Sequence, residues 1–201
     1  MYGGLMILVA FICIAMMWTE GMWGNALTLV NVTFAALLAM NFYEPVASVI
    51  DDRMHSFTYY ADFLSQWLLF AVSLAVLTIS TDQLSKHHVR FKMPVEQVGR
   101  AIFAAATAWV FVCFVTATMH TAPLARSPFR GSFQQEPLSK NVFGLAPDRM
   151  FLGFMHSSSK AALANSTPTP FDKEGDYILK YGARRQSLKE LNAKDGTTRV
   201  K

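Results

Sequence analysis

The chain has 201 residues, of which 52% are hydrophobic and only 16% are charged. A soluble domain carries about 25% charged residues, so this composition argues against an ordinary soluble protein. The shortage of charge is confined to the first 120 residues, which hold only five of the 18 lysines and arginines: Arg53, Lys86, Arg90, Lys92 and Arg100. The sequence therefore predicts a lipid-solvated domain, residues 1–120, followed by a tail at the membrane surface or in water, residues 121–201.

Four apolar runs in the first domain are each expected to cross a bilayer as a helix. They extend from about Leu5 to Trp18, from Gly24 to Tyr43, from Phe63 to Ile79 and from Ala101 to Met119. A crossing helix needs about 20 apolar residues to span hydrocarbon about 30 Å thick, and the first run is the shortest of the four. The predicted fold class is an all-α membrane protein with four transmembrane helices.

Two segments between these runs are expected to lie at the membrane surface. Glu44-Pro45 is predicted to end the second helix, because a residue before proline disfavours helical geometry. Residues 46–57 then mix apolar and charged side chains, which is typical of an amphipathic linker on the surface. Residues 86–93 alternate basic and apolar side chains, so they are predicted to contact lipid headgroups through Lys86, Arg90 and Lys92.

Small and weakly polar residues recur at steps of three and four in the second and fourth runs. The second run carries Gly24, Thr28, Asn31, Ala35 and Ala39, and the fourth carries Gly99, Ala101, Ala104, Ala105 and Ala108. Such stripes let helices in lipid approach closely, so these two helices are predicted to pack as a pair. The alternative interpretation is a polar transport path past Asn25, Asn31, Asn41 and Thr107.

Acidic side chains are costly inside a bilayer, and their presence there would hint at a proton relay. Glu20, Asp62 and Asp82 all lie at the edges of predicted helices, so this hint is missing. Asp62, Ser65 and Gln66, where the third run begins, are expected to face protein or headgroups rather than lipid.

The tail is expected to be mostly irregular, because prolines and glycines punctuate residues 123–147. Pro147-Asp148 is predicted to begin one short helix, whose face with Phe151, Phe154 and Met155 rests on the membrane or on the helical bundle. Residues 177–181 are predicted to form a strand after a turn. The basic remainder, residues 184–201, is expected to be frayed or disordered.

No sequence motif carries an enzymatic mechanism, since phosphate-loop, His-Glu-x-x-His and Gly-x-Ser-x-Gly patterns are all absent. The adjacent His87 and His88 have no further ligands at suitable spacing, so neither a metal site nor another cofactor is expected. The basic tail lacks a clustered stripe with stacking aromatic residues, so no nucleic-acid partner is expected.

The order of helices and turns in residues 1–120 bears on function. A turn with the sequence Glu-Gly-Met-Trp-Gly-Asn-Ala-Leu-Thr-Leu (residues 20–29) leads into a second helix that ends with Asn-Phe-Tyr-Glu-Pro (residues 41–45). The third run starts with Phe-Leu-x-x-Trp-Leu-Leu-Phe (residues 63–70), and Val98-Gly99-Arg100 precedes the fourth. This layout resembles the colicin V production protein family, although the first turn is not basic and Gly99 replaces repeated glycines.

The resemblance implies a multi-pass protein of the bacterial inner membrane that supports colicin V or protein export, or envelope maintenance. It implies no catalytic residue, because the family offers no agreed catalytic motif. The expected partners are the lipid bilayer and copies of the same chain or other membrane proteins. A small transporter or channel that uses the asparagine path is the alternative function.

Overall fold

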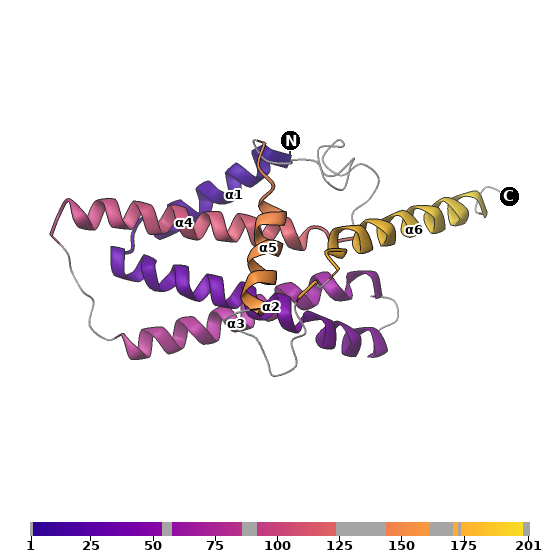
Figure 1. Cartoon of the computed structure of the whole chain (residues 1–201), viewed down its shortest axis with the longest axis horizontal. Helices are drawn as coiled ribbons and strands as arrows, with labels where there is room; N and C mark the ends of the chain where they lie inside the picture. Colours follow the sequence, from indigo (N-terminus) through magenta and orange to yellow (C-terminus); the bar gives the residue numbers. More distant parts are fainter. Residues whose placement is uncertain are drawn as a thin grey trace.

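The computed structural model describes residues 2–53, 58–85, 92–123, 144–160, 171–172 and 174–198. These residues form six helices, α1 (Tyr2–Met17), α2 (Met22–Arg53), α3 (Thr58–Leu84), α4 (Val95–Thr118), α5 (Pro147–Lys160) and α6 (Tyr177–Thr198). The long helices α2, α3 and α4 form the body of the molecule, α5 runs across them, and α6 extends from one end (Figure 1). The predicted all-α class is therefore confirmed for the described part of the chain.

Three helices, α2, α3 and α4, are long and apolar enough to cross a membrane. In α3 and α4 the uncharged stretch runs from Asp62 to Asp82 and from Arg100 to His120, about 20 residues or 30 Å in each case. The fourth predicted span, α1, is apolar but has only 16 residues, which correspond to about 24 Å of helix. Three of the four predicted spans thus have the required length, and α1 falls short of it.

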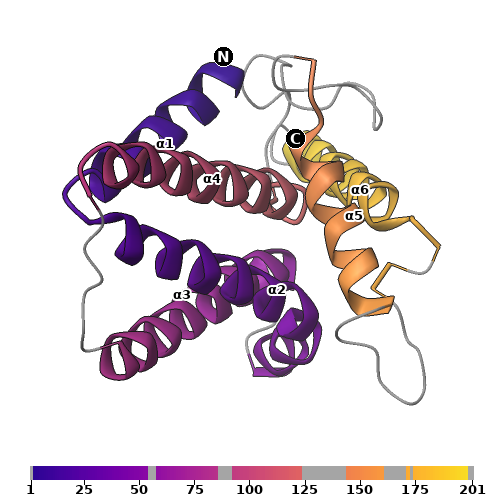
Figure 2. The same ribbon diagram turned by 60° about the vertical axis from the view of Figure 1, so that its left-hand side comes forward.

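The central helix is α2, which packs against α3 and α4, while α1 packs against α4 on the far side (Figure 2). Ala35, Ala36 and Ala39 of α2 have no exposed surface. Side chains as small as these let neighbouring helix backbones come close, which is how helices in lipid gain packing energy.

Aromatic side chains fill the space between α3, α4 and α5. Phe70 of α3 stacks on Phe114 of α4 with ring centroids 4.5 Å apart, and Trp67 meets Phe114 edge-on at 5.7 Å. Phe151 of α5 approaches the same Phe114 at 5.8 Å. Stacked and edge-on ring pairs stabilise beyond their burial alone, so Phe114 joins three helices at once.

The turn between α1 and α2 is held by the first turns of α4. The Glu96 carboxylate accepts a hydrogen bond from the Met22 backbone N–H at 2.7 Å, where the positive end of the α2 dipole favours an anion. The Arg100 guanidinium donates to the Trp18 carbonyl at 3.2 Å and lies 5.3 Å from the Trp18 ring centre. A Cβ on Gly99 would lie 2.0 Å from the Met22 sulfur, so the glycine makes room for this contact.

The prediction that Glu44-Pro45 ends the second helix was wrong, because α2 continues to Arg53 with Pro45 inside it. Proline in a helix interior costs about 3 kcal/mol through a lost hydrogen bond and a clash. Tyr43 and Ala47, on either side of Pro45, are 3% and 5% exposed, and their burial helps to offset this cost. The predicted amphipathic linker is therefore the last part of α2 as far as Arg53, and residues 54–57 lie outside the described residues.

The prediction for the tail was wrong at residues 177–198, while residues 124–143, most of the segment expected to be irregular, lie outside the described residues. The short helix was correctly placed at Pro147, but residues 177–181 begin helix α6 instead of forming a strand, and α6 continues to Thr198 through the segment expected to be disordered. The Asp172 carboxylate accepts hydrogen bonds from the backbone N–H groups of Asp176 and Tyr177, which supplies partners at the start of α6. A short apolar run fits a strand or a helix equally well, and the hydrogen bonds to Asp172 favour the helix.

Replacing Ala108 with leucine is expected to destabilise the bundle by about 1–3 kcal/mol, because this side chain is 2% exposed and extra carbons would overpack the interface. The matched control is Ala105→Leu, on the same helix but exposed, which is expected to change stability by less than about 0.5 kcal/mol. Thermal unfolding of the purified protein in detergent measures both. Equal losses in the two variants would contradict the packing described here.

Candidate functional site

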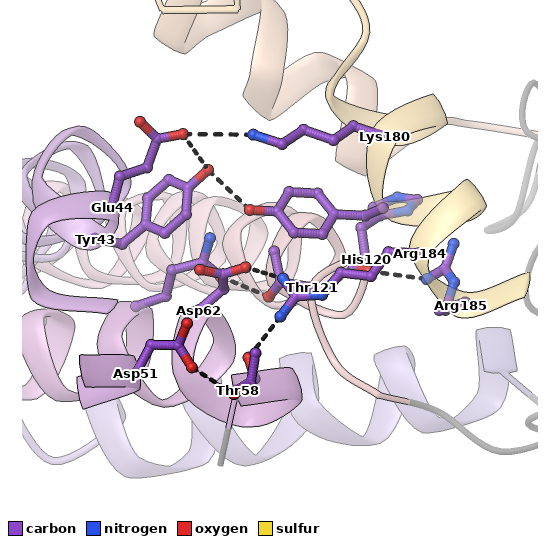
Figure 3. Close-up of polar contacts among 12 residues, drawn as sticks. Tyr43, Glu44, Asp51, Thr58, Asp62, His120, Thr121, Lys180, Arg184 and Arg185 are labelled. Carbon is purple, nitrogen blue, oxygen red and sulfur yellow. Dashed lines mark hydrogen bonds and ion pairs between the residues drawn. The ribbon is translucent and has the colours of Figure 1, made fainter. Parts of the chain in front are cut away.

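Polar side chains from distant parts of the sequence gather where α6 meets the ends of α2, α3 and α4 (Figure 3). We call this group the tail cluster; it consists of Tyr43, Glu44, Asp51, Thr58, Asp62, Gln66, Thr121, Tyr177, Lys180, Tyr181 and Arg184. Its contacts join residues as far as 138 positions apart in the chain. The tail is therefore docked on the helical bundle by side-chain chemistry.

Gln66 lies at the centre of the tail cluster with no exposed surface. Its Oε1 accepts a hydrogen bond from the Thr121 hydroxyl at 2.9 Å, and its Nε2 donates to the Tyr177 hydroxyl at 3.1 Å. A buried amide is costly unless it is hydrogen-bonded. Gln66 therefore ties α3 to the segment after α4 and to α6, and burial raises the pKa of the Tyr177 phenol, which keeps it neutral.

Two tyrosines form a second link. The hydroxyls of Tyr43 on α2 and Tyr181 on α6 lie 3.1 Å apart, and the Tyr43 hydroxyl donates to the Glu44 carboxylate at 3.3 Å. Because the hydroxyl hydrogen of Tyr43 is used in the hydrogen bond to Glu44, the Tyr181 hydroxyl donates the hydrogen bond to Tyr43. Lys180 also approaches Glu44, at 3.7 Å, but both side chains are more than half exposed, so this pair contributes little.

Arg184 makes the third link. Its guanidinium pairs with the Asp62 carboxylate, donates to the Thr58 carbonyl and lies 5.6 Å from the Tyr59 ring centre. The side chains of Arg184 and Asp62 are 29% and 17% exposed, so the pair is partly desolvated. The planar, multiply donating guanidinium suits this combination of a carboxylate, a carbonyl and a ring better than an ammonium group would.

A buried contact between a histidine and an aspartate docks α5 close to this cluster. His120 Nε2 lies 2.9 Å from Asp148 Oδ2, and the two side chains are 0% and 4% exposed. Burial raises the pKa of the Asp148 carboxyl, but the hydrogen bond and charge of His120, together with the backbone N–H and charge of Arg149, lower it by more, so the pKa lies below its ordinary value. The carboxylate therefore stabilises the fold at neutral pH, and this contribution is lost as the pH falls through the ordinary Asp pKa toward the lowered one.

The end of α4 is also bound by α6. The Arg185 guanidinium donates to the His120 carbonyl at 3.0 Å, and burial lowers the pKa of Arg185. Both tail helices thus attach to residues that directly follow α4. The hydrogen-bond donors and acceptors of the tail cluster bond one segment of the chain to another, which fits a role in docking the tail on the bundle.

The structure divides the small-residue stripes into buried and exposed members. Buried are Asn31, Ala35, Ala39, Ala104 and Ala108; Gly24, Thr28 and Gly99 are half-buried, and Ala101 and Ala105 are exposed. The buried side of α4 follows steps of four from Ala104 through Ala108 to Val112, whereas Ala101 and Ala105 lie off this line. Helices α2 and α4 pack against each other, and α2 packs against α3 as well, where Asn31 bonds Thr81.

The polar residues of the alternative transport path make hydrogen bonds to helices. Asn25 Nδ2 donates to a backbone carbonyl of α4 at 3.2 Å, and Asn31 Nδ2 donates to Thr81 of α3 at 2.9 Å. Thr107 and Asn41 each bond a carbonyl one turn earlier in their own helix. Asn25 and Asn31 therefore serve as links between helices in this structure.

Of the three predicted headgroup contacts, only Lys92 is described, and it lies at the end of the bundle opposite the tail cluster. Lys92, just before α4, is exposed there. Lys86 and Arg90 lie outside the described residues.

Sequence reasoning missed the tail half of the tail cluster. Tyr177, Tyr181 and Arg184 follow steps of four and three, which is the spacing of one helix face and was the available signal. On the other half, Ser65 and Gln66 were expected to face protein or headgroups, and both are fully buried within the protein.

Replacing Arg184 with alanine is expected to weaken the docking of α6 by about 1–3 kcal/mol, because the Asp62 carboxylate loses its charged partner. The matched control is Lys180→Ala on the same helix, where the exposed pair with Glu44 is worth less than about 1 kcal/mol. Hydrogen exchange of the α6 backbone amides measures local opening. Identical exchange in the two variants would refute the docking role of Arg184.

Comparison with known proteins gives one family. The family model described as colicin V production protein matches residues 4–141, which include nearly all of α1 and the whole of α2, α3 and α4, and which end before α5. No curated protein and no solved structure matches the chain. The match covers well over half of the sequence and extends the resemblance noted above beyond residue 120. The chain belongs to the colicin V production protein family.

Proposed function

We propose that this protein is a non-enzymatic component of the bacterial inner membrane that supports toxin or protein export, or envelope maintenance, through contacts between helices. The family match carries the proposal, since it covers the apolar helices and names colicin V production. Family membership and three apolar helices make the chain a multi-pass membrane protein. Its proposed partners are lipid and copies of itself or other membrane proteins.

Helix α3 supports the proposal that this protein acts through contacts between helices. Only 17% of its membrane-length segment is buried within the chain, against 56% for α4. Its free face is apolar and consists of Leu64, Leu68, Val72, Val76 and Ile79. These residues follow steps of four and three, so they form one continuous stripe that is available to lipid or to a partner helix.

The tail cluster supports the same proposal from the aqueous side. Its hydrogen bonds fix the ends of α2 and α3 through α6, so the free stripe of α3 is presented by a braced helix. A rigid helix loses less conformational entropy on association than a mobile one, which favours specific contacts.

Tryptophan substitution along α3 tests the proposal in a strain that lacks the chromosomal gene. If α3 packs on a partner, tryptophan at positions of the stripe such as Leu68 or Val72 should reduce colicin V export or envelope resistance to detergent several-fold. The bulky ring would overpack a helix contact, whereas lipid would accommodate it. Export and detergent survival are measured alongside protein abundance.

The matched control is Ile102→Trp on α4, which is 60% exposed and outside the stripe, and which should leave function intact. Two results together would overturn the proposal that α3 packs on a partner helix. The first is normal function with tryptophan at every position of the stripe, and the second is a monomeric protein without partners in native lipid discs. Normal export and a normal envelope in the deletion strain would overturn the assigned process itself.

A further inference from the structure

Helix α5 lies outside the membrane-spanning set, yet it packs on the side of the bundle. It runs across the axes of α2 and α4 rather than along them in both views (Figure 1, Figure 2). Its partner in the bundle is α4. If the long helices cross a bilayer, a helix at this angle lies in the plane of the membrane.

The inner face of α5 is committed to the bundle. Its buried residues are Pro147, Asp148, Phe151, Leu152 and Met155. Phe151 contacts Phe114, and Asp148 pairs with His120. The face predicted from the sequence for Phe151 and Met155 therefore rests on the bundle.

The outer face of α5 carries large apolar side chains in its first half, followed by the exposed Ser157 and Lys160 near its end. Met150 and Phe154, four residues apart on one side of the helix, are 51% and 45% exposed, and Leu145 just before the helix is 47% exposed. Of the residues predicted to share one face, Phe154 is thus turned away from Phe151. A surface helix in water would carry polar residues at these outward positions.

The depth of α5 follows from its contacts. Phe114, which Phe151 touches, precedes His120 by six residues, or about 9 Å along α4. Asp148 at the other end of the same face is level with His120, where the uncharged stretch of α4 ends. Amphipathic helices at a membrane surface sink their apolar side by about 5–10 Å, which is the same depth range.

Several polar groups of α5 have partners within the protein, as a site poor in water favours, although Asp148 Oδ1 is buried without one among the described residues. The Asp148 Oδ2 atom lies 2.9 Å from His120 Nε2, and the Ser157 hydroxyl donates to the Gly153 carbonyl at 2.9 Å. The Ser159 hydroxyl donates to the His156 carbonyl at 2.9 Å, and the same oxygen accepts from the Phe171 backbone N–H. These bonds lower the cost of placing a serine-rich segment against lipid.

We infer that α5 is an in-plane membrane helix whose Leu145, Met150 and Phe154 side chains insert into the boundary between headgroups and acyl chains of the bilayer that the spans cross. Lipid is the occupant because α5 packs on α4 at Phe114, within the uncharged stretch, at a depth where the bundle itself is surrounded by lipid. The inference rests on membrane residence and does not depend on the proposed role in export.

Spin labels on the full chain in lipid nanodiscs test this inference. The background carries Cys13→Ala, and the native Cys113, which is 5% exposed, is protected from the label by burial. Cysteines are introduced one at a time at Met150 and Phe154, with Val72 of α3 as the lipid reference and Gln186 of α6 as the aqueous reference. Collision rates with oxygen and with a water-soluble nickel chelate are then compared.

At Met150 and Phe154 the spin label is expected to collide with oxygen several-fold more often than with the nickel chelate, as at Val72. At Gln186 collisions with the nickel chelate are expected to be the more frequent. Nickel access at both positions equal to that at Gln186 would overturn the inference. Spin–spin broadening at both positions would also overturn it, because a second copy of the chain would then cover this face.

A second measurement needs no substitution. Lipids that carry a photoreactive group in the upper acyl chain are incorporated into nanodiscs with the unmodified protein, and labelled peptides are mapped by mass spectrometry. Labelling of residues 144–160 alongside α3 is expected. Labelling of α3 without any label in residues 144–160 would overturn the inference.

Discussion

The close approach of α2 to both of its long neighbours is the contact on which the remaining structure depends. Apolar side chains gain little by leaving lipid for another apolar surface, so helices in a bilayer associate through dispersion contacts and hydrogen bonds. Three alanines without exposed surface (Ala35, Ala36 and Ala39) supply that contact on α2. Larger residues at these positions would separate the backbones and move Asn31 away from Thr81 on α3.

Polar side-chain contacts lie at the two ends of this apolar bundle, and they hold different segments at each end. At one end Glu96 and Arg100 hold the turn between α1 and α2. At the other end Gln66, Asp62 and Tyr43 receive α6, and His120 receives α5. Side-chain bonds to the backbone of a turn therefore stabilise one end of the bundle, and the docked tail stabilises the other.

The sequence predicted the elements of the membrane domain well, because an uncharged apolar run of about 20 residues is typical of a membrane-spanning helix. Prediction failed where distant contacts decide the local outcome. Pro45 sits within a helix because buried neighbours stabilise it, and residues 177–181 form a helix with Tyr177, Ile178 and Tyr181 buried in the folded protein. The tail cluster escaped prediction for the same reason, since the pairing of Gln66 with Tyr177 spans 111 positions.

That long separation has a consequence for the order in which the chain is completed. A ribosome makes α3 well before α6, at about 5–20 residues per second, so Gln66 and Asp62 enter the membrane region before their partners exist. Until then their polar groups depend on headgroups and water. The tail end of the bundle is therefore closed last, when Tyr177 reaches Gln66 and Arg184 reaches Asp62.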